Sequence, residues 1–146
     1  MEKTVIILSG GFDPVHKGHV RMFKDAKEFP STVVIGLNSD RWLTRKKGKP
    51  FMDWDERKEI LDVMSCVDEV YSFNDDDDSA CDLIRKVREQ YKDSEDIKLY
   101  FGNGGDRTDS NSPEVDYCNK NNIDLLWGVG GGKIQSSSDL LKKSKA

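Results

Sequence analysis

Both histidines of the chain, His16 and His19, lie three residues apart in the segment Gly10-Gly-Phe-Asp-Pro-Val-His-Lys-Gly-His19. This segment follows a short apolar run, Thr4–Ser9, and leads into an amphipathic stretch, so the imidazoles are expected at a turn from a strand into a helix. Backbone N–H groups and the helix dipole favour an anion at such a turn. Imidazole N–H groups could therefore hold phosphate oxygens and stabilise charge that develops in a transition state. The alternative is that the two histidines only cap the helix or pack under a loop.

Gly18 lies between the histidines, where a side chain would obstruct a phosphate that approaches closely. Because the two histidines converge at a glycine-rich turn, we favour the phosphate site over the capping alternative. We expect His16 and His19 to contact the α- and β-phosphates of a nucleoside triphosphate.

A basic stretch at residues 41–50 carries two further candidate catalytic residues, Lys47 and Lys49. Gly48 and Pro50 interrupt regular structure there, so we expect a mobile loop that closes over the triphosphate and stabilises the departing pyrophosphate. The alternative is a solvated surface stretch. Mg²⁺ is expected on the triphosphate, coordinated mainly by phosphate and water, with Asp13 or Asp40 reaching it through water.

Near the end of the chain, Ser136, Ser137 and Ser138 follow a glycine-rich segment at 128–132. We expect Ser136 to open a short helix whose hydroxyl and N–H groups bind the β- and γ-phosphates. The glycine-rich segment is not a P-loop, because Trp127 stands where that motif requires glycine and Ile134 stands where it requires Ser or Thr. The chain also lacks the spaced glycines of a dinucleotide-binding oxidoreductase.

The elements that must position these residues alternate along the chain. Apolar runs at 4–9, 31–37, 69–73, 98–101 and 124–129 predict five strands, separated by amphipathic stretches that predict helices. This alternation predicts an α/β fold, a single doubly wound, Rossmann-like, five-stranded parallel sheet with helices on both faces, spanning residues 1–146 as one domain. Ligands of such sheets bind at the carboxyl ends of the strands.

Composition excludes several other classes. The 146 residues include 23 Lys and Arg against 27 Asp and Glu, and the resulting net charge of −4 argues against nucleic-acid binding. The apolar runs are too short to cross a bilayer and the start does not look like a signal peptide, so a cytoplasmic protein without membrane contact is expected. Three widely spaced cysteines predict neither a disulfide framework nor a zinc site. The acidic run Asp75–Asp78 is expected to be a solvated turn.

The segment Gly11–His19 resembles the His-x-Gly-His signature of the cytidylyltransferase-like nucleotidyltransferases, and the serines at 136–138 resemble the Ser/Thr cluster of that family. Further similarities are Asn38-Ser-Asp40, the lysines before Pro50, Glu56-Arg57, Val67-Asp-Glu-Val70 and Gly104-Gly-Asp106. The set is most similar to the adenylyltransferase domain that activates heptose 1-phosphate, and next to glycerol-3-phosphate cytidylyltransferase.

The resemblance implies an enzyme that transfers a nucleoside monophosphate from ATP or CTP to a small phosphorylated acceptor and releases pyrophosphate. It assigns the acceptor to Asn38, Asp40 and Arg57, although Arg57 could instead pair with Glu56 or Asp53. The nucleotide is assigned to the serine cluster together with Gly10, Gly11, Phe12, Asp13, Gly18, Gly105 and Asp106.

ATP is favoured over CTP, because Ser65 and either Gly131 or Lys133 replace arginines that are typical of the cytidylyltransferases. A sugar phosphate or polyol phosphate is the expected acceptor. The Phe12-Asp-Pro14 sequence also resembles pantetheine-phosphate and nicotinate-mononucleotide adenylyltransferases. A non-catalytic nucleotide-binding module is the rival from a different class. Members of the family are often dimers, so a homodimer is a further expectation.

Overall fold

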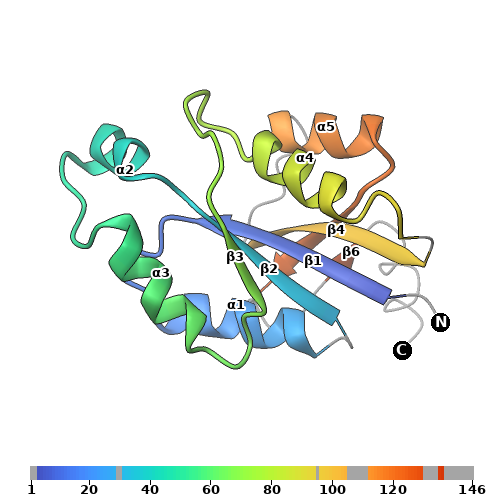
Figure 1. Cartoon of the computed structure of the whole chain (residues 1–146), viewed down its shortest axis with the longest axis horizontal. Coiled ribbons are helices and arrows are strands. Elements are labelled where there is room, and N and C mark those ends of the chain that lie inside the picture. Colours follow the sequence, from blue (N-terminus) through green and yellow to red (C-terminus); the bar gives the residue numbers. More distant parts are fainter. Residues whose placement is uncertain (1–2, 29–30, 95, 105–111, 130–134, 137–146) are drawn as a thin grey trace.

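A computed structural model describes residues 3–28, 31–94, 96–104, 112–129 and 135–136 and contains one six-stranded sheet (Figure 1). The strand order is β3-β2-β1-β4-β5-β6. The first five strands pair in parallel and β6 pairs antiparallel with β5. Their bounds are β1 Lys3–Gly10, β2 Ser31–Leu37, β3 Glu69–Tyr71, β4 Ile97–Gly104, β5 Asp124–Val129 and β6 Gln135–Ser136. The predicted five-stranded parallel sheet is confirmed, with a short sixth strand added at one edge.

Helices cover both faces of this sheet, as the doubly wound pattern predicts. α1 and α3 lie against one face, whereas α4 and α5 lie against the other (Figure 1). α2 stands apart, beyond the carboxyl ends of the strands. The bounds are α1 Lys17–Lys27, α2 Asp40–Lys47, α3 Trp54–Asp62, α4 Cys81–Gln90 and α5 Pro113–Lys120.

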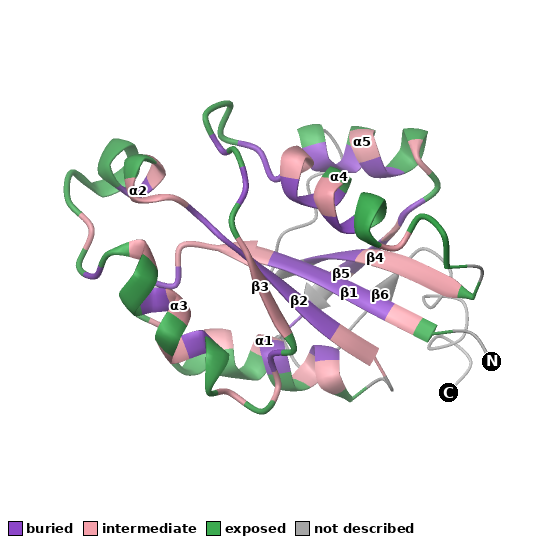
Figure 2. Cartoon of the chain, in the orientation of Figure 1, coloured by how far each residue is buried: buried purple, intermediate pink, exposed green. Residues whose placement is uncertain are grey.

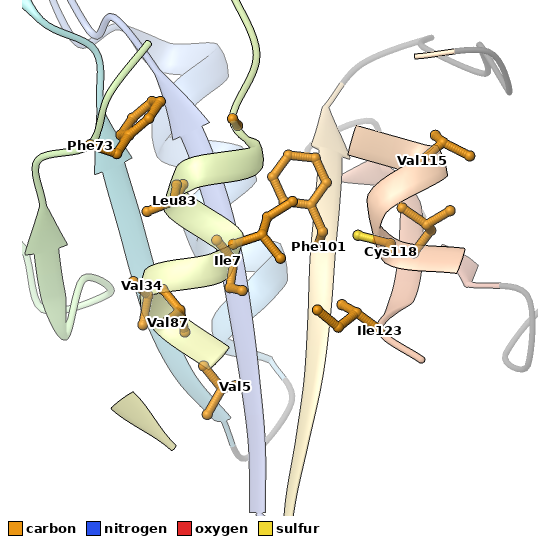
Figure 3. Packing of buried hydrophobic residues seen from close by; sticks show 13 residues of the cluster. Val5, Ile7, Val34, Phe73, Leu83, Val87, Phe101, Val115, Cys118 and Ile123 are labelled. Carbon is orange, nitrogen blue, oxygen red and sulfur yellow. The ribbon is translucent and has the colours of Figure 1, made fainter. Parts of the chain in front are cut away.

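The central strand β1 supplies both halves of the core, because successive side chains of a strand point to opposite faces. Val5 and Ile7 pack in the cluster that contains the apolar face of α4, including Leu83 (Figure 3). Ile6 and Leu8 belong to the second cluster, which contains side chains of α1 and α3. All four β1 residues are buried, and Figure 2 shows this burial along β1 and β2. The apolar runs without polar alternation therefore correctly predicted strands buried on both faces.

The basic stretch differs from its prediction, because most of it forms helix α2 where a mobile loop was expected. Ser39 caps this helix by accepting a hydrogen bond from the N–H of Trp42 at 3.1 Å. Leu43 is buried and anchors the helix, which ends where Gly48 adopts a φ of 88°. A side-chain cap and one buried contact thus order a short segment whose composition alone resembles a loop.

Asp75–Asp78 is also not a uniformly solvated turn, since Asp75 is buried. Its carboxylate accepts hydrogen bonds from the Asn38 side chain and from both the N–H and the hydroxyl of Ser39, at 2.7–2.9 Å. Burial alone would raise the pKa of Asp75, but these hydrogen bonds outweigh it and lower the pKa. Asp76 and Asp78 remain exposed, as expected of a turn.

At the other end of the chain, Ser136 lies in β6 and does not begin a helix. Its backbone pairs with Leu126, and the neighbouring Gln135 pairs with Trp127. Sheet pairing is therefore the local structure at Ser136. Ser137 and Ser138 lie outside the described residues.

Candidate active site

The two histidines close the N-terminus of α1 in a reciprocal arrangement. His16 is the N-cap, and its Nδ1 accepts the backbone N–H of Gly18 at 3.1 Å. Nδ1 of His19 accepts the backbone N–H of His16, also at 3.1 Å. The capping alternative considered for the histidines is therefore part of the structure, since two otherwise unpaired donors of the helix end are satisfied by imidazole nitrogens.

Among the residues that the structure describes, no hydrogen bond engages the other nitrogen of either ring. In a neutral imidazole whose Nδ1 accepts a hydrogen bond, the proton resides on Nε2. The rings of His16 and His19 stack with their centroids 3.8 Å apart and their planes 26° apart. Capping and phosphate binding are therefore compatible, because they use different nitrogens.

Phe12 also contacts the ring of His19. The two rings meet edge to face with centroids 4.8 Å apart, and Phe12 in turn contacts Phe23 of α1 at 5.4 Å. Phe12 is buried and adopts a φ of 49°, so the turn directs its side chain into the core. The sequence predicted that Phe12 contacts the nucleotide. In the structure its buried side chain packs against the ring of His19.

Partial burial of His19 and, to a smaller extent, the charge of His16 together lower the pKa of its imidazole to about 4. His19 is thus a neutral hydrogen-bond donor at neutral pH. A phosphate bound at this turn needs its counter-charge from other residues, which makes the nearby lysines important.

Asp13 lies in the same turn and binds residues at the end of α2 and just after it. Its side chain is only 2% exposed and forms an ion pair with Lys47 at 2.7 Å. The carboxylate also accepts the backbone N–H groups of Phe51 at 2.6 Å and Met52 at 2.7 Å. Burial alone would raise the pKa of Asp13, but the hydrogen bonds from Lys47 and these N–H groups lower it. Asp13 therefore fastens the segment that follows α2 to the turn that precedes α1.

The cations of the basic stretch separate into two groups. Arg45 lies 3.0 Å from Asp78, and Arg41 lies 3.6 Å from Asp76, so the acidic turn neutralises this side of α2. Lys47 faces the histidine turn, where its ammonium also donates to the carbonyl of Asp13 at 2.8 Å. Lys49 follows two residues later with an exposed side chain. The tertiary structure thus brings Lys47 to the turn but does not direct every cation there.

Arg57 is fully buried at the centre of this end of the sheet. One of its terminal nitrogens donates to the carbonyls of Gly11 and Asn38, each at 2.8 Å, and Nε donates to the carbonyl of Met52 at 3.1 Å. Its ion-pair partner is Asp40, at 2.7 Å, rather than Glu56 or Asp53. The guanidinium thereby joins the ends of β1 and β2 to the start of α3.

Two glycines permit close packing at the turn. A Cβ on Gly11 would lie 2.8 Å from the Leu43 side chain of α2, and a Cβ on Gly18 would lie 3.0 Å from the ring of His16. Larger residues would therefore force the Leu43 side chain or the His16 ring to move. Close packing of the protein itself is thus a second reason for these glycines, besides access for phosphate.

The predicted site is assembled in part. His16, His19, Asp13, Lys47 and Arg57 gather at the carboxyl ends of β1 and β2. Gly105 and Asp106 lie outside the described residues, and for Ser136 only the backbone pairing is described. Sequence reasoning missed Asp75, which was expected to be solvated but is buried and bonded to Ser39 at the same end of the sheet.

Within the part of the chain that the structure describes, no three His, Cys, Asp or Glu side chains form a group that could hold a metal ion. No helix in those same residues is long and apolar enough to cross a membrane. The three cysteines are free thiols, of which Cys118 is buried.

A parallel sheet with helices on both faces carries the histidine pair at its first strand-to-helix turn. Solved structures share this fold. The lipopolysaccharide core biosynthesis protein from Thermoplasma volcanium matches with a TM-score of 0.63 at 18% identity, over 86% of this chain and 93% of that one. A bifunctional NMN adenylyltransferase/ADP ribose pyrophosphatase from Francisella tularensis matches with a TM-score of 0.57 at 16% identity, over 87% of this chain and 38% of that one.

The chain belongs to the cytidylyltransferase-like family, whose model matches residues 7–129. Among curated relatives, it is 40% identical over 88 residues to the bifunctional protein HldE of Syntrophotalea carbinolica, and 39% identical over 88 residues to that of Geobacter sulfurreducens. Each match covers 59% of this chain but only 18% of the relative. The similarity to these relatives is therefore confined to a small part of their length.

Proposed function

We propose that the chain transfers a nucleoside monophosphate, AMP in preference to CMP, from a triphosphate to a sugar phosphate or polyol phosphate. The observation that supports this most strongly is the stacked histidine pair, whose Nδ1 atoms cap α1 while Nε2 remains available as a donor. Such donors lie at a helix N-terminus, where anions are stabilised. Membership of the cytidylyltransferase-like family supports the same class of reaction.

In the proposed reaction an oxygen of the acceptor phosphate attacks the α-phosphorus of the triphosphate. A new P–O bond forms while the bond from the α-phosphorus to the oxygen that bridges to the β-phosphorus breaks, and that oxygen leaves with pyrophosphate. The nucleophile is already an anion, so alignment and charge neutralisation matter more than a general base. His16 and His19 donate to α- and β-phosphate oxygens, which become more negative in the transition state.

Lys47 and Lys49 provide the positive charge that the neutral His19 lacks. Lys47 spans from the end of α2 to Asp13, so its ammonium stands beside the turn before any ligand binds. Because α2 is an ordered helix, we propose that the lysine is presented on a fixed element rather than on a mobile lid. Such preorganisation avoids the cost of ordering a loop during the reaction.

Mg²⁺ would be held mainly by the triphosphate. The oxygens of Asp13 already accept from Lys47, Phe51 and Met52, and Oδ1 of Asp40 accepts from Arg57. These residues therefore fit a metal coordinated by phosphate and water better than one bound in a protein cage. When bound, the ion would neutralise charge on the phosphate oxygens.

A pyrophosphate-release assay tests the proposal. ATP and CTP are each combined with heptose 1-phosphate, glycerol 3-phosphate, nicotinate mononucleotide and phosphopantetheine. We expect release with ATP and one of the first two acceptors. Activity only with CTP would overturn the nucleotide preference. Activity only with one of the last two would overturn the acceptor class, and nucleotide binding without any release would support the non-catalytic module.

A further inference from the structure

Helix α2 has little apolar contact with the rest of the molecule. Of its eight residues, all of which the structure describes, only Leu43 is buried. Most helices in proteins are held by the packing of an apolar face, and this short helix has almost none. Hydrogen bonds and ion pairs must therefore fix the position of α2, and that position decides where Lys47 lies.

These polar contacts use two opposite faces of α2. Successive residues of an α-helix are turned by about 100°, so residues two apart lie on nearly opposite faces and residues four apart share a face. Leu43 and Lys47 form the front face, which lies against the histidine turn. Arg41 and Arg45 form the rear face, which pairs with the acidic run at 75–78. The helix therefore spans the space between the acidic run and the histidine turn.

Asp75 holds α2 at two points. Its carboxylate accepts the N–H and the hydroxyl of Ser39 at 2.8 and 2.7 Å. The same hydroxyl oxygen accepts the N–H of Trp42 and so caps the helix. The backbone carbonyl of Asp75 accepts Nη2 of Arg45 at 2.8 Å, more than one turn further along. Two contacts at this spacing fix the direction of the helix as well as its start.

The acidic run is itself fixed to the sheet. Asn38, which directly follows β2, donates to the carboxylate of Asp75 at 2.9 Å, and Asp75 is only 1% exposed. The backbone N–H of Asp78 donates to the carbonyl of Asp75 at 3.0 Å, and the Asp78 carboxylate lies 3.0 Å from Nη2 of Arg45. The rear face of α2 thus rests on a buried anchor rather than on isolated surface pairs.

We propose that Asp75 and Arg45 are positioning residues, which hold α2 from the rear so that Lys47 on its front face meets the polyphosphate at the histidine turn. Neither of them contacts the ligand. Moving a catalytic group by about 1 Å can cost about 100-fold in rate, so contacts on the far side of the helix affect kcat. This inference rests on the proposed function, because it explains how that reaction obtains its lysine.

A double-mutant cycle between Arg45 and Lys47 tests the proposal. Arg45→Gln removes the guanidinium that bonds to Asp75 and Asp78. We expect it to lower kcat about tenfold and to leave KM for the triphosphate within about twofold. In the Lys47→Met background the same change should lower kcat less than about twofold further, because the lysine that it positions is gone. An unchanged kcat in Arg45→Gln, or the full tenfold loss in the Lys47→Met background, would overturn the proposal.

Asp75→Asn tests the buried anchor while Arg45 stays in place. We expect kcat to fall about as much as in Arg45→Gln. Asp77→Asn is the matched control, since it removes the same charge from the same run but Asp77 accepts the N–H and hydroxyl of Ser79, outside α2. Its kcat should stay within about twofold of the wild type. Equal kcat values in a folded Asp75→Asn and in Asp77→Asn would overturn the role of Asp75, and the Arg45 cycle decides alone if Asp75→Asn does not fold.

Trp42 reports the position of α2 without turnover. A Cβ on Gly11 would lie 3.6 Å from its indole ring, so the ring stands beside the histidine turn. The indole N–H resonance is identified by its loss in Trp42→Phe. It should shift in Arg45→Gln and in Asp75→Asn but not in Asp77→Asn, and an unshifted resonance in Arg45→Gln would overturn the positioning. Such a shift in a protein that releases no pyrophosphate from any substrate pair would instead overturn the proposed function and leave the positioning of α2 standing.

Discussion

The imidazole of His19 accepts the backbone N–H of His16 at 3.1 Å while its ring stacks on that of His16. Each histidine therefore positions the other, and both are held at the start of α1. His16 thus has two roles, which are capping the helix through Nδ1 and donating from Nε2. A single alanine substitution would remove both roles together.

His16→Asn separates these roles, because asparagine is a strong N-cap residue but has no group in place of Nε2. We expect the thermal midpoint to stay within about 2 °C of the wild type, and kcat to fall roughly 10²–10³-fold, as when one transition-state donor is lost. His16→Ala should lose the cap as well and unfold at a lower temperature. Steady-state kinetics with thermal unfolding checks this, and full activity in His16→Asn would rule out the donor role.

The pKa of His19, lowered to about 4 by burial and by His16, makes stability depend on pH. The unfolded chain binds a proton near pH 6.5 and the folded chain only near pH 4, so the unfolded state is favoured increasingly as pH falls between these values. We expect the contribution of His19 to the free energy of unfolding to stay constant above about pH 6.5 and to decrease as the pH falls toward 4. Denaturant titrations across this range should show the decrease in the wild type but a smaller one in His19→Asn.

Asp75 is expected to stabilise the turn that leads into α2, because its buried carboxylate accepts three hydrogen bonds. In Asp75→Asn one of the two acceptor oxygens is replaced by an NH2 group, which is a donor and cannot accept these hydrogen bonds. The free energy of unfolding should fall by about 2 kcal/mol. Asp76→Asn is the control, since its carboxylate is exposed and the change should stay within about 0.5 kcal/mol. Equal results for the two variants in chemical denaturation would contradict the role given to Asp75.

Lys47 and Lys49 should differ in what their loss affects. Lys47→Met leaves the buried Asp13 carboxylate without its cation, so stability should fall by roughly 1–2 kcal/mol together with kcat. Lys49→Met should lower kcat about 100-fold with stability unchanged, because its exposed side chain acts only on the ligand. Lys58→Met, which removes an exposed surface pair with Asp62, should change neither quantity appreciably. A stable Lys47→Met variant would show that the pair with Asp13 is dispensable.

Arg57→Gln is expected to lower the free energy of unfolding by roughly 3 kcal/mol, since three backbone carbonyls and Asp40 lose a shared donor. KM for both substrates should rise, because the guanidinium connects Gly11 of the histidine turn to Asp40. Arg85→Gln provides a surface control that breaks an exposed pair with Asp82. Normal stability with a higher acceptor KM alone would favour the direct acceptor contact inferred from sequence.

Several elements could be predicted from neighbouring residues because their causes are local. Asp53 caps α3 by accepting the N–H of Glu56, and an aspartate three residues before a glutamate is itself a local signal for the start of a helix. Ser112 followed by Pro113 begins α5, because serine is a favourable N-cap and proline is tolerated in the first helical turn. The start of α2 has an equally local cause in Ser39, but the charged composition of the stretch obscured it.

The sequence by itself determined the alternation of strands and helices, both faces of the core and the histidine turn, because spacing along the chain sets which side chains share a face. Only the tertiary structure decided which charged groups pair with protein atoms and which remain for a ligand. Arg57 and Gly11 are 46 residues apart, and Asp75 and Asn38 are 37 residues apart. Such contacts depend on how β1, β2 and β3 lie side by side. A polar side chain buried there bonds to the groups that the fold brings near it, whatever its neighbours in the sequence are.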